Sequence, residues 1–209
     1  MNVKRLFGAL SVNICILLVI GGCIMFSAGG DFIVSFKPAV SFEEMFNGAE
    51  VKAGSHVAGE VVYSLGYYAA ESTYTQRSDG SRSGDKANGR YYLIPIAEGE
   101  NYIGLKAREV DVSAMEKVTK ETEEWILGGA EPSTKIVMQG TVEVMEGQLA
   151  DFYKESLMGL GYSRSDIDDM GEPLVVQYRS FTAVRVMFGV GLGLVLLGVF
   201  FIYRGYKRG

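Results

Sequence analysis

The residue types that most often perform catalysis are sparse in this chain. His56 is the only histidine, and it follows Ser55 in a glycine-rich turn. A Ser-His-Asp triad would have to use it, yet the G-x-S-x-G elbow of many serine hydrolases is absent. Residues 83–86 (SGDK) match the S-x-x-K pattern of serine acyl enzymes, but they lie in the most polar stretch of the chain. We therefore predict no catalytic residue and no cofactor, and we favour a non-enzymatic protein.

The densest group of carboxylates lies in residues 166–172 (DIDDMGE). Oxygen ligands beside a glycine turn suit Ca²⁺, but Met170 and Gln177 occupy the fifth and twelfth positions of an EF-hand loop, where oxygen ligands are required. We favour an acidic, solvated turn that is capped by Ser163 or Ser165. A calcium site is the alternative, and its ligands would be Asp166, Asp168, Asp169 and Glu172.

Tyrosines are concentrated between residues 63 and 102. Such side chains line the binding faces of some peptide- and glycan-binding domains, because one end is apolar and the other forms hydrogen bonds. We favour a different interpretation, in which they are half-buried residues of a sheet or lie near lipid headgroups. The residues are Tyr63, Tyr67, Tyr68, Tyr74, Tyr91, Tyr92 and Tyr102.

Two apolar stretches enclose these residues. Residues 6–30 carry no charge, and neither do residues 186–203. A helix needs about 20 apolar residues to cross a bilayer, so we predict two transmembrane helices, in contact with lipid, that flank one extracytoplasmic domain. The predicted layout is a cytoplasmic tail (1–5), helix one (6–30), the domain (31–182), helix two (183–203) and a second tail (204–209).

Charge supports this orientation. Residues 31–182 contain all 25 acidic residues and 14 of the 20 basic ones, which gives a net charge of −11. The basic flanks Lys4 and Arg5, and likewise Arg204 and Lys207, favour two cytoplasmic termini in a multi-pass protein of the cell membrane, with residues 31–182 outside. An acidic domain repels phosphate backbones, so we expect no nucleic acid partner.

The two cysteines, Cys15 and Cys23, both lie in the first apolar stretch. Eight helical residues place them about 12 Å apart, too far for a disulfide between them. Residues 19–23 (VIGGC) also match a lipoprotein cleavage box, in which Cys23 would be lipidated. Because the apolar run continues after Cys23, we favour an uncleaved anchor and keep lipidation as the alternative.

The second apolar stretch contains a G-x-x-x-G pattern, Gly189 and Gly193, that allows close helix packing. The simplest use is packing of the two spans against each other. The alternative is that this face pairs with another membrane protein or with a second copy of the chain. Neither stretch has an internal acidic or basic residue, so nothing indicates an ion or proton path.

The domain between the helices has the pattern of an α+β fold. We predict a curved, mostly antiparallel sheet or small barrel, with Pro95 at an edge or a bulge. A helix is expected at 113–127, with a capping box formed by Ser113 and Glu116, and another at 148–158, with Phe152 among the residues that face the core. A short helical turn is expected at 41–46 and a polar loop at 76–89. Strands are expected in 31–36, 51–75, 90–97, 102–107, 136–145 and 174–179.

The glycine-punctuated segment 54–68, together with residues 92–95 (YLIP) and 102–106 (YIGLK), resembles uncharacterised two-pass membrane proteins of Gram-positive bacteria. The resemblance implies no activity, cofactor or catalytic residue. We expect a membrane-anchored, non-enzymatic protein whose outer domain binds or scaffolds another membrane or envelope protein. The alternatives are an envelope enzyme with a carboxylate-based site and a lipidated extracytoplasmic sensor or binding protein.

Overall fold

The computed structural model describes residues 12–76, 78, 80–84 and 86–208. Within it the chain forms two compact units. One contains the two terminal helices, up to Lys37 and from Ser180 onward, and the other is the domain Pro38–Arg179. Each unit is described by itself.

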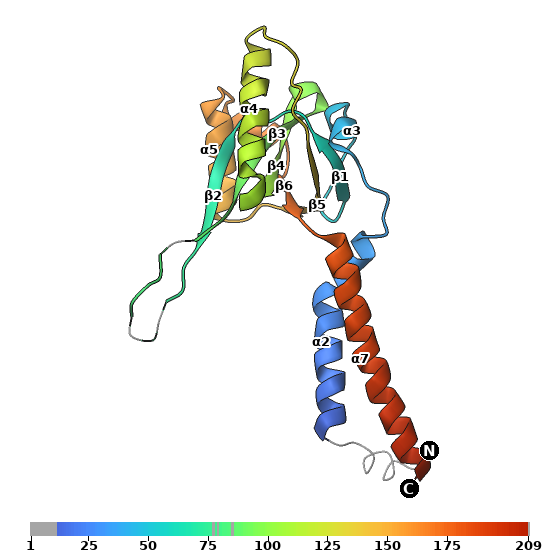
Figure 1. The fold of residues 1–209 in the computed structure, drawn as a ribbon. Coiled ribbons are helices and arrows are strands. Elements are labelled where there is room, and N and C mark those ends of the chain that lie inside the picture. The colour runs from blue at the N-terminus through green and yellow to red at the C-terminus, as the bar shows by residue number, and fades with distance from the viewer. Residues whose placement is uncertain (1–11, 77, 79, 85, 209) are drawn as a thin grey trace. The chain divides into compact units, whose positions relative to one another are not determined.

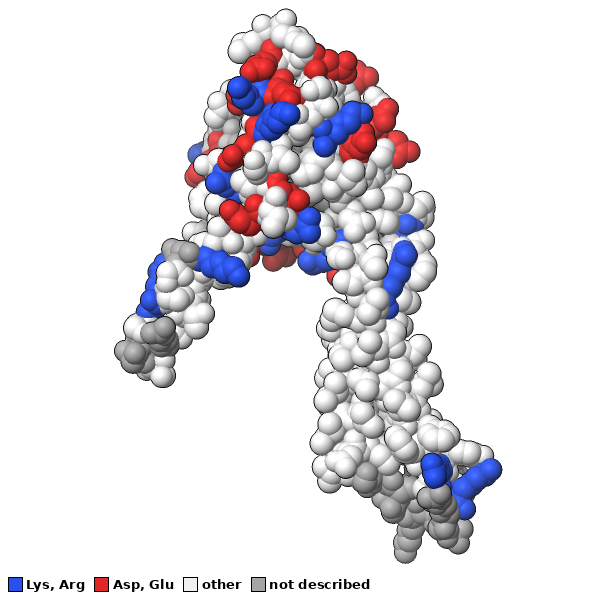
Figure 2. Space-filling view, viewed as in Figure 1, with Lys and Arg blue, Asp and Glu red and all other residues white. Residues whose placement is uncertain are grey.

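The terminal helices are α2 (Val12–Val34) and α7 (Phe181–Arg208), and they pack along each other (Figure 1). Both are long and apolar enough to cross a membrane. Figure 2 shows them as a band of uncharged side chains with basic residues near its ends. Lys37 and Arg185 lie toward one end of this band, and Arg204 and Lys207 lie at the other.

The strand that we predicted at residues 31–36 is wrong. The first helix continues through Val34 and ends in a turn. The hydroxyl of Ser35 donates to the carbonyl of Phe32 at 2.7 Å, as expected at the end of a helix. A short apolar run such as Phe32–Val34 does not distinguish a strand from the last turn of an apolar helix.

The domain contains one six-stranded mixed sheet in the order β1-β5-β6-β4-β3-β2 (Figure 1). Only the β4–β6 pair is parallel, so the expected mostly antiparallel sheet is confirmed. β3 begins at Lys86, inside the stretch that we predicted to be a loop. The strands are β1 (His56–Val61), β2 (Tyr67–Thr73), β3 (Lys86–Ile96), β4 (Asn101–Arg108), β5 (Ile136–Val144) and β6 (Leu174–Tyr178).

Helices cover both faces of the sheet, and alternate residues of each strand supply the two cores. On β3, Tyr92 and Ile94 join one core with Met115 of α4, whereas Leu93 joins the other with Leu157 of α5. The first core also contains the short helix α3, and the second contains α6. The bounds are α3 (Phe42–Phe46), α4 (Val112–Ile126), α5 (Gln148–Gly159) and α6 (Arg164–Asp169), with short 3₁₀ turns at Ala97–Gly99 and Glu109–Asp111.

The predicted helices are present, but two details differ. α4 follows directly on a 3₁₀ turn with Asp111 as its N-cap residue, so the expected capping box of Ser113 and Glu116 is not formed. The Asp111 carboxylate instead accepts from Arg108 at 2.6 Å. In α5, Phe152 was expected in the core but is 43% exposed.

The sheet is strongly curved, although it does not close into the barrel that we considered. β1 and β2 are opposite edges of the sheet, yet only residues 62–66 connect them. Six flat strands would place their edges about 24 Å apart, and six residue steps reach at most about 20–22 Å. The sheet therefore bends so that β1 approaches the end of β3 that extends beyond β2.

Candidate functional site

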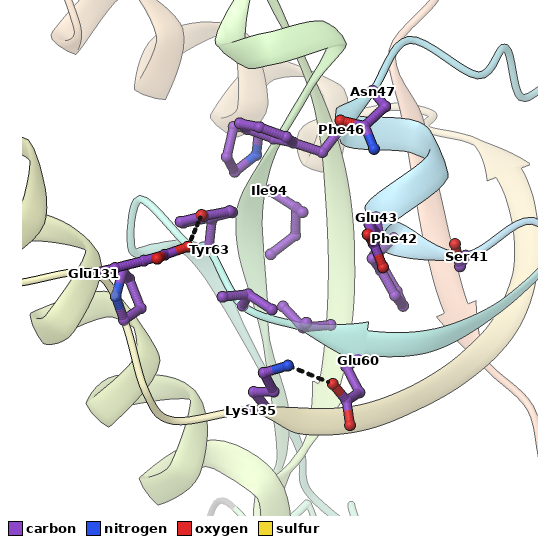
Figure 3. Close-up of a pocket in the computed structure, with 14 residues that line it drawn as sticks. Ser41, Phe42, Glu43, Phe46, Asn47, Glu60, Tyr63, Ile94, Glu131 and Lys135 are labelled. Carbon is purple, nitrogen blue, oxygen red and sulfur yellow. Dashed lines mark hydrogen bonds and ion pairs between the residues drawn. The ribbon is translucent and has the colours of Figure 1, made fainter.

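One cavity of the domain lies where the curved sheet remains open. It is a groove of about 530 Å³, within the usual range of ligand sites. Four segments that are distant in sequence enclose it: α3, the end of β1, the end of β3 and the loop before β5 (Figure 3). We call it the aromatic groove. Its lining residues are Ser41, Phe42, Glu43, Phe46, Asn47, Glu60, Val61, Val62, Tyr63, Ile94, Pro95, Glu131, Pro132 and Lys135.

The base of the aromatic groove is apolar and rigid. Phe42, Val61 and Ile94 belong to the first core, where each is at most 5% exposed. On one side the ring of Phe46 lies 5.0 Å from that of Tyr63. Tyr63 in turn packs against Trp125 of α4, with ring centroids 5.1 Å apart. Aromatic pairs at these separations hold each other in place, so the wall is ordered before any ligand enters.

The rim of the aromatic groove is acidic. Glu43 and Glu131 lie on opposite sides of it, and a third carboxylate, Glu60, accepts from Lys135 at 2.9 Å (Figure 3). The lining therefore carries a net charge of −2. Hydrogen bonding and Coulomb attraction to Glu60 raise the pKa of Lys135, and Glu43 and Glu131 raise it further. The groove thus favours positive charge.

The negative charge of the groove also affects the phenol of Tyr63. Partial burial raises the pKa of its phenol, and the negative charge of Glu131 raises it further. The phenol donates to Glu131 at 3.4 Å, so it remains protonated at neutral pH. It is therefore a hydrogen-bond donor and an aromatic surface rather than a base.

The loop that carries Glu131 and Lys135 is held against α4 by one carboxylate. Glu121 accepts from the backbone N–H of Ser133 at 2.8 Å and from that of Thr134 at 2.7 Å. The Thr134 hydroxyl also donates to it at 2.6 Å. These hydrogen bonds lower the pKa of Glu121 to about 2. The carboxylate is therefore ionised at all ordinary pH values and fixes the position of the groove wall.

Pro95 lies at the edge of the groove, and its expected edge position is confirmed. β2 pairs with β3 only as far as Tyr92, and the linker continues the pairing through hydrogen bonds between Leu93 and residues 65–66. Beyond that point β3 pairs only with β4, where Pro95 lies opposite Tyr102. A residue without an N–H is tolerated there because no ladder hydrogen bond is needed on the open side.

One comparison with known proteins gives a match. A family model described as a domain of unknown function, DUF8577, matches residues 4–204. This chain belongs to the DUF8577 family. The match covers both terminal helices as well as the domain between them, so the whole arrangement is the family unit. Comparisons with curated proteins and with solved structures give no match. The DUF8577 description assigns no activity, and the resemblance to Gram-positive proteins stays a prediction.

In this DUF8577 chain the residues that were considered for acyl transfer are in unrelated places. His56 begins β1, where its carbonyl accepts from the N–H of Val40. Ser83 lies in the loop between β2 and β3, where its hydroxyl accepts from Thr75 at 2.8 Å and its N–H donates back to the same residue. Ser83 therefore shapes this loop, and no nucleophile–base pair is formed by these two residues.

The carboxylates of residues 166–172 lie on and after α6. Asp166 is in a capping box with Ser163, in which the Ser163 N–H donates to its carboxylate at 2.8 Å. The capping role that we favoured for Ser163 is confirmed. Asp168, Asp169 and Glu172 are exposed. Across the described part of the chain, no three His, Cys, Asp or Glu side chains form a group that could hold a metal ion.

The tyrosines do not form one binding face. Tyr92 is buried beneath α4, whereas Tyr68 and Tyr102 face α5 and pack against Tyr153 and Tyr162 respectively. The half-buried interpretation is therefore confirmed for Tyr68, Tyr91 and Tyr102, whereas Tyr67 is 56% exposed and Tyr74 is 52% exposed. Burial raises the pKa of Tyr68 and of Tyr102 far above the ordinary range, so neither ionises. Only Tyr63 lines the aromatic groove.

In the helix pair, the closest approach involves different glycines from the two that we singled out. A Cβ on Gly21 would lie 2.7 Å from the carbonyl oxygen of Gly191, and a Cβ on Gly191 would lie 2.9 Å from that of Gly21. Gly189 and Gly193 have open space where their Cβ atoms would be. The expected packing of the two spans on each other is thus present, but it uses Gly191 rather than the G-x-x-x-G pair.

Sequence reasoning missed most of the aromatic groove. Phe46 was placed in a short helix and Pro95 at an edge, but Glu43, Glu131 and Lys135 carried no recognisable pattern. The available signals were the capping box that begins at Ser41 and the edge proline. Neither shows that residues some 90 positions apart in sequence form one surface, because that depends on the curvature of the sheet.

Proposed function

We propose that this protein is a non-enzymatic, two-pass membrane protein whose outer domain binds or scaffolds another membrane or envelope protein. Both termini are cytoplasmic in this proposal, and residues 31–182 are outside. The observation that carries it is the aromatic groove, which has an ordered aromatic wall and an open strand edge. These are features of binding surfaces.

The chemistry of the aromatic groove supports binding rather than catalysis. Its lysine is paired with Glu60, its tyrosine remains protonated, and its lining contains neither histidine nor cysteine. Its other carboxylates, Glu43 and Glu131, are both exposed on the rim. General acid–base chemistry favours carboxylates in a secluded pocket, which an exposed rim does not supply.

The helix pair supports the membrane anchor. α2 passes through Cys23 without a break, and its contact with Gly191 of α7 is formed two residues before Cys23. Cleavage before Cys23 would remove Gly21 and with it this contact. The uncleaved anchor is therefore the arrangement that we propose.

The test is purification of the tagged full-length chain from its native membranes in a mild detergent, with the co-eluting proteins identified by mass spectrometry. We expect a stoichiometric membrane or envelope protein. The control is a variant that retains the helices but has Phe46→Ala and Tyr63→Ala in the groove, and we expect this variant to lose the partner. Recovery of a solitary monomer from the wild-type chain would overturn the proposal.

A further inference from the structure

The aromatic groove also has an excess of negative charge, and this charge lies beside an open strand edge. Its only basic lining residue, Lys135, is already paired with Glu60. The lining therefore sets three carboxylates, Glu43, Glu60 and Glu131, against the single positive charge of Lys135, and Glu43 and Glu131 lie on opposite sides of the groove (Figure 3). A cation that entered would lie between two carboxylates.

The aromatic wall favours the same kind of group. A lysine ammonium or an arginine guanidinium is attracted to the face of an aromatic ring, by about 0.5–2 kcal/mol depending on how far it is desolvated. Phe46 and Tyr63 lie side by side on one wall of the groove, with ring centroids 5.0 Å apart and ring planes tilted by 30°. The domain already uses this contact elsewhere, since the guanidinium of Arg90 lies 4.8 Å from the ring centre of Tyr67.

The strand edge distinguishes a polypeptide from a free small cation. On β1 the carbonyl of His56 and the N–H of Ala58 face away from β5 and bond to Val40. Because backbone direction alternates along a strand, the N–H and C=O of Glu60 point to the same outer side. There the segment containing Val40 has already turned into α3, and the groove lies alongside Glu60. An extended peptide can add to such an edge through main-chain hydrogen bonds.

The opposite edge limits where such a peptide binds. Pro95 offers a carbonyl but no N–H, so β3 cannot supply a full ladder. A peptide would therefore pair with β1 and place alternate side chains against Phe46 and Tyr63. This arrangement leaves room for a single added strand, because the groove is bounded by α3 on one side and by the loop of Glu131 on the other.

We propose that the aromatic groove binds an extended basic polypeptide segment, with a lysine or arginine side chain between Glu43 and Glu131 and its backbone along β1 at Glu60. This inference rests on the proposed binding function and specifies the partner's chemistry. Anionic polymers are excluded as ligands of the groove by the same charges.

Trp125 provides a built-in reporter for the test. It is the only tryptophan of the chain, and its ring packs on Tyr63 at the wall of the groove. The full-length chain in neutral nanodiscs is titrated with a short alternating Lys-Ala peptide, blocked at both ends, while tryptophan emission is recorded. The comparison probes are the corresponding Glu-Ala and Ser-Ala peptides and n-butylammonium.

We expect a saturable emission change with the Lys-Ala peptide that weakens as salt is added, and none with the Glu-Ala peptide. Glu43→Gln with Glu131→Gln should weaken binding by about two- to fivefold per charge removed. Phe46→Ala should weaken it by up to about tenfold. The matched control is Asp168→Asn with Asp169→Asn, which removes the same charge from α6, outside the groove.

Several results would overturn the inference. Equal weakening by the groove and α6 charge variants would show only general attraction to an acidic domain. Equal affinity for n-butylammonium and the peptide would show a small-cation site. If no basic peptide binds but a protein still co-purifies with the chain, the inference fails while the proposed function stands. If neither is observed, both fail.

Discussion

The helix pair and the domain of this protein are stabilised in opposite ways. In the helix pair the backbones approach because side chains are missing, at Gly21 and Gly191. In the domain the elements are held together by large buried side chains, such as Met115 and Leu157, both of which are 0% exposed. The helix contact depends on the absence of side-chain atoms, whereas the core of the domain depends on side chains that fill it.

We attribute this difference to the surroundings in which we propose that each unit lies, namely lipid for the helix pair and water for the domain. In lipid, apolar side chains gain little by leaving their surroundings, so helix association depends on close packing and hydrogen bonds. In water, each fully buried leucine contributes roughly 1.5–3 kcal/mol. In the helix pair, Arg185 also donates to both the hydroxyl and the carbonyl of Ser35.

The largest expected effect is the loss of stability when a cavity is created in the core of the domain. Leu157→Ala should lower the free energy of unfolding by about 2–5 kcal/mol, because the removed atoms leave a void beneath α5. The measurement is chemical denaturation of the full chain in detergent, followed by Trp125 emission. Leu127→Ala is the control, since Leu127 is 87% exposed and its loss should change stability by less than about 0.5 kcal/mol. Equal effects of the two substitutions would contradict the assignment of the core.

The converse change adds a side chain to the glycine contact of the helix pair. Gly191→Leu should separate α2 from α7, toward the axial distance of about 8–10 Å that ordinary side chains impose. Domain stability should not change. The measurement is the distance between spin labels at Val19 and Leu197, both exposed, in a chain whose Cys15 and Cys23 are replaced by serine.

Gly189→Leu is the matched control for that experiment. Gly189 lies two residues away and has open space at its Cβ position, so the added side chain should leave the distance between the helices unchanged. Separation by both substitutions would show that the helix pair does not have the geometry described. Separation by Gly189→Leu alone would indicate that the G-x-x-x-G face is the one that packs.

The smallest effect concerns a polar contact in the domain. The folded pKa of Glu121 is lowered to about 2, so this carboxylate stabilises the domain above its ordinary pKa of 4.5, and the contribution is lost as the pH falls toward 2. Glu121→Gln should lower the melting temperature at pH 7. The difference in melting temperature between this variant and wild type should shrink as the pH falls from about 4.5 to 2.

The control for this titration is Glu124→Gln, on the same helix. Glu124 forms an exposed ion pair with Lys120, at 3.7 Å, and pairs of this kind contribute about 0–1 kcal/mol. Its melting temperature should follow that of wild type at each pH. A pH-independent difference for Glu121→Gln would show that the hydrogen bonds from Ser133 and Thr134 do not depend on its charge.

Most of the elements could be predicted from local pattern. Met115, Val118 and Thr122 recur at helical spacing and are buried in α4, and the alternation of residues 136–144 is that of a strand with two covered faces. Errors occurred where a short pattern is ambiguous. Residues 31–36 are rich in Phe, Ile and Val like a strand but lie at the end of a helix, and Phe152 fits the helical stripe of α5 but faces outward.

The sequence by itself determined the apolar ends, the acidic domain between them, the α+β class and the scarcity of catalytic residues, because composition and period depend only on neighbours along the chain. Tertiary structure alone decided which glycines meet and where the aromatic groove lies. Phe46, Tyr63 and Glu131 become neighbours because a short linker bends the sheet until its first strand reaches the free end of β3. That approach is a property of the whole sheet, and no local pattern records it.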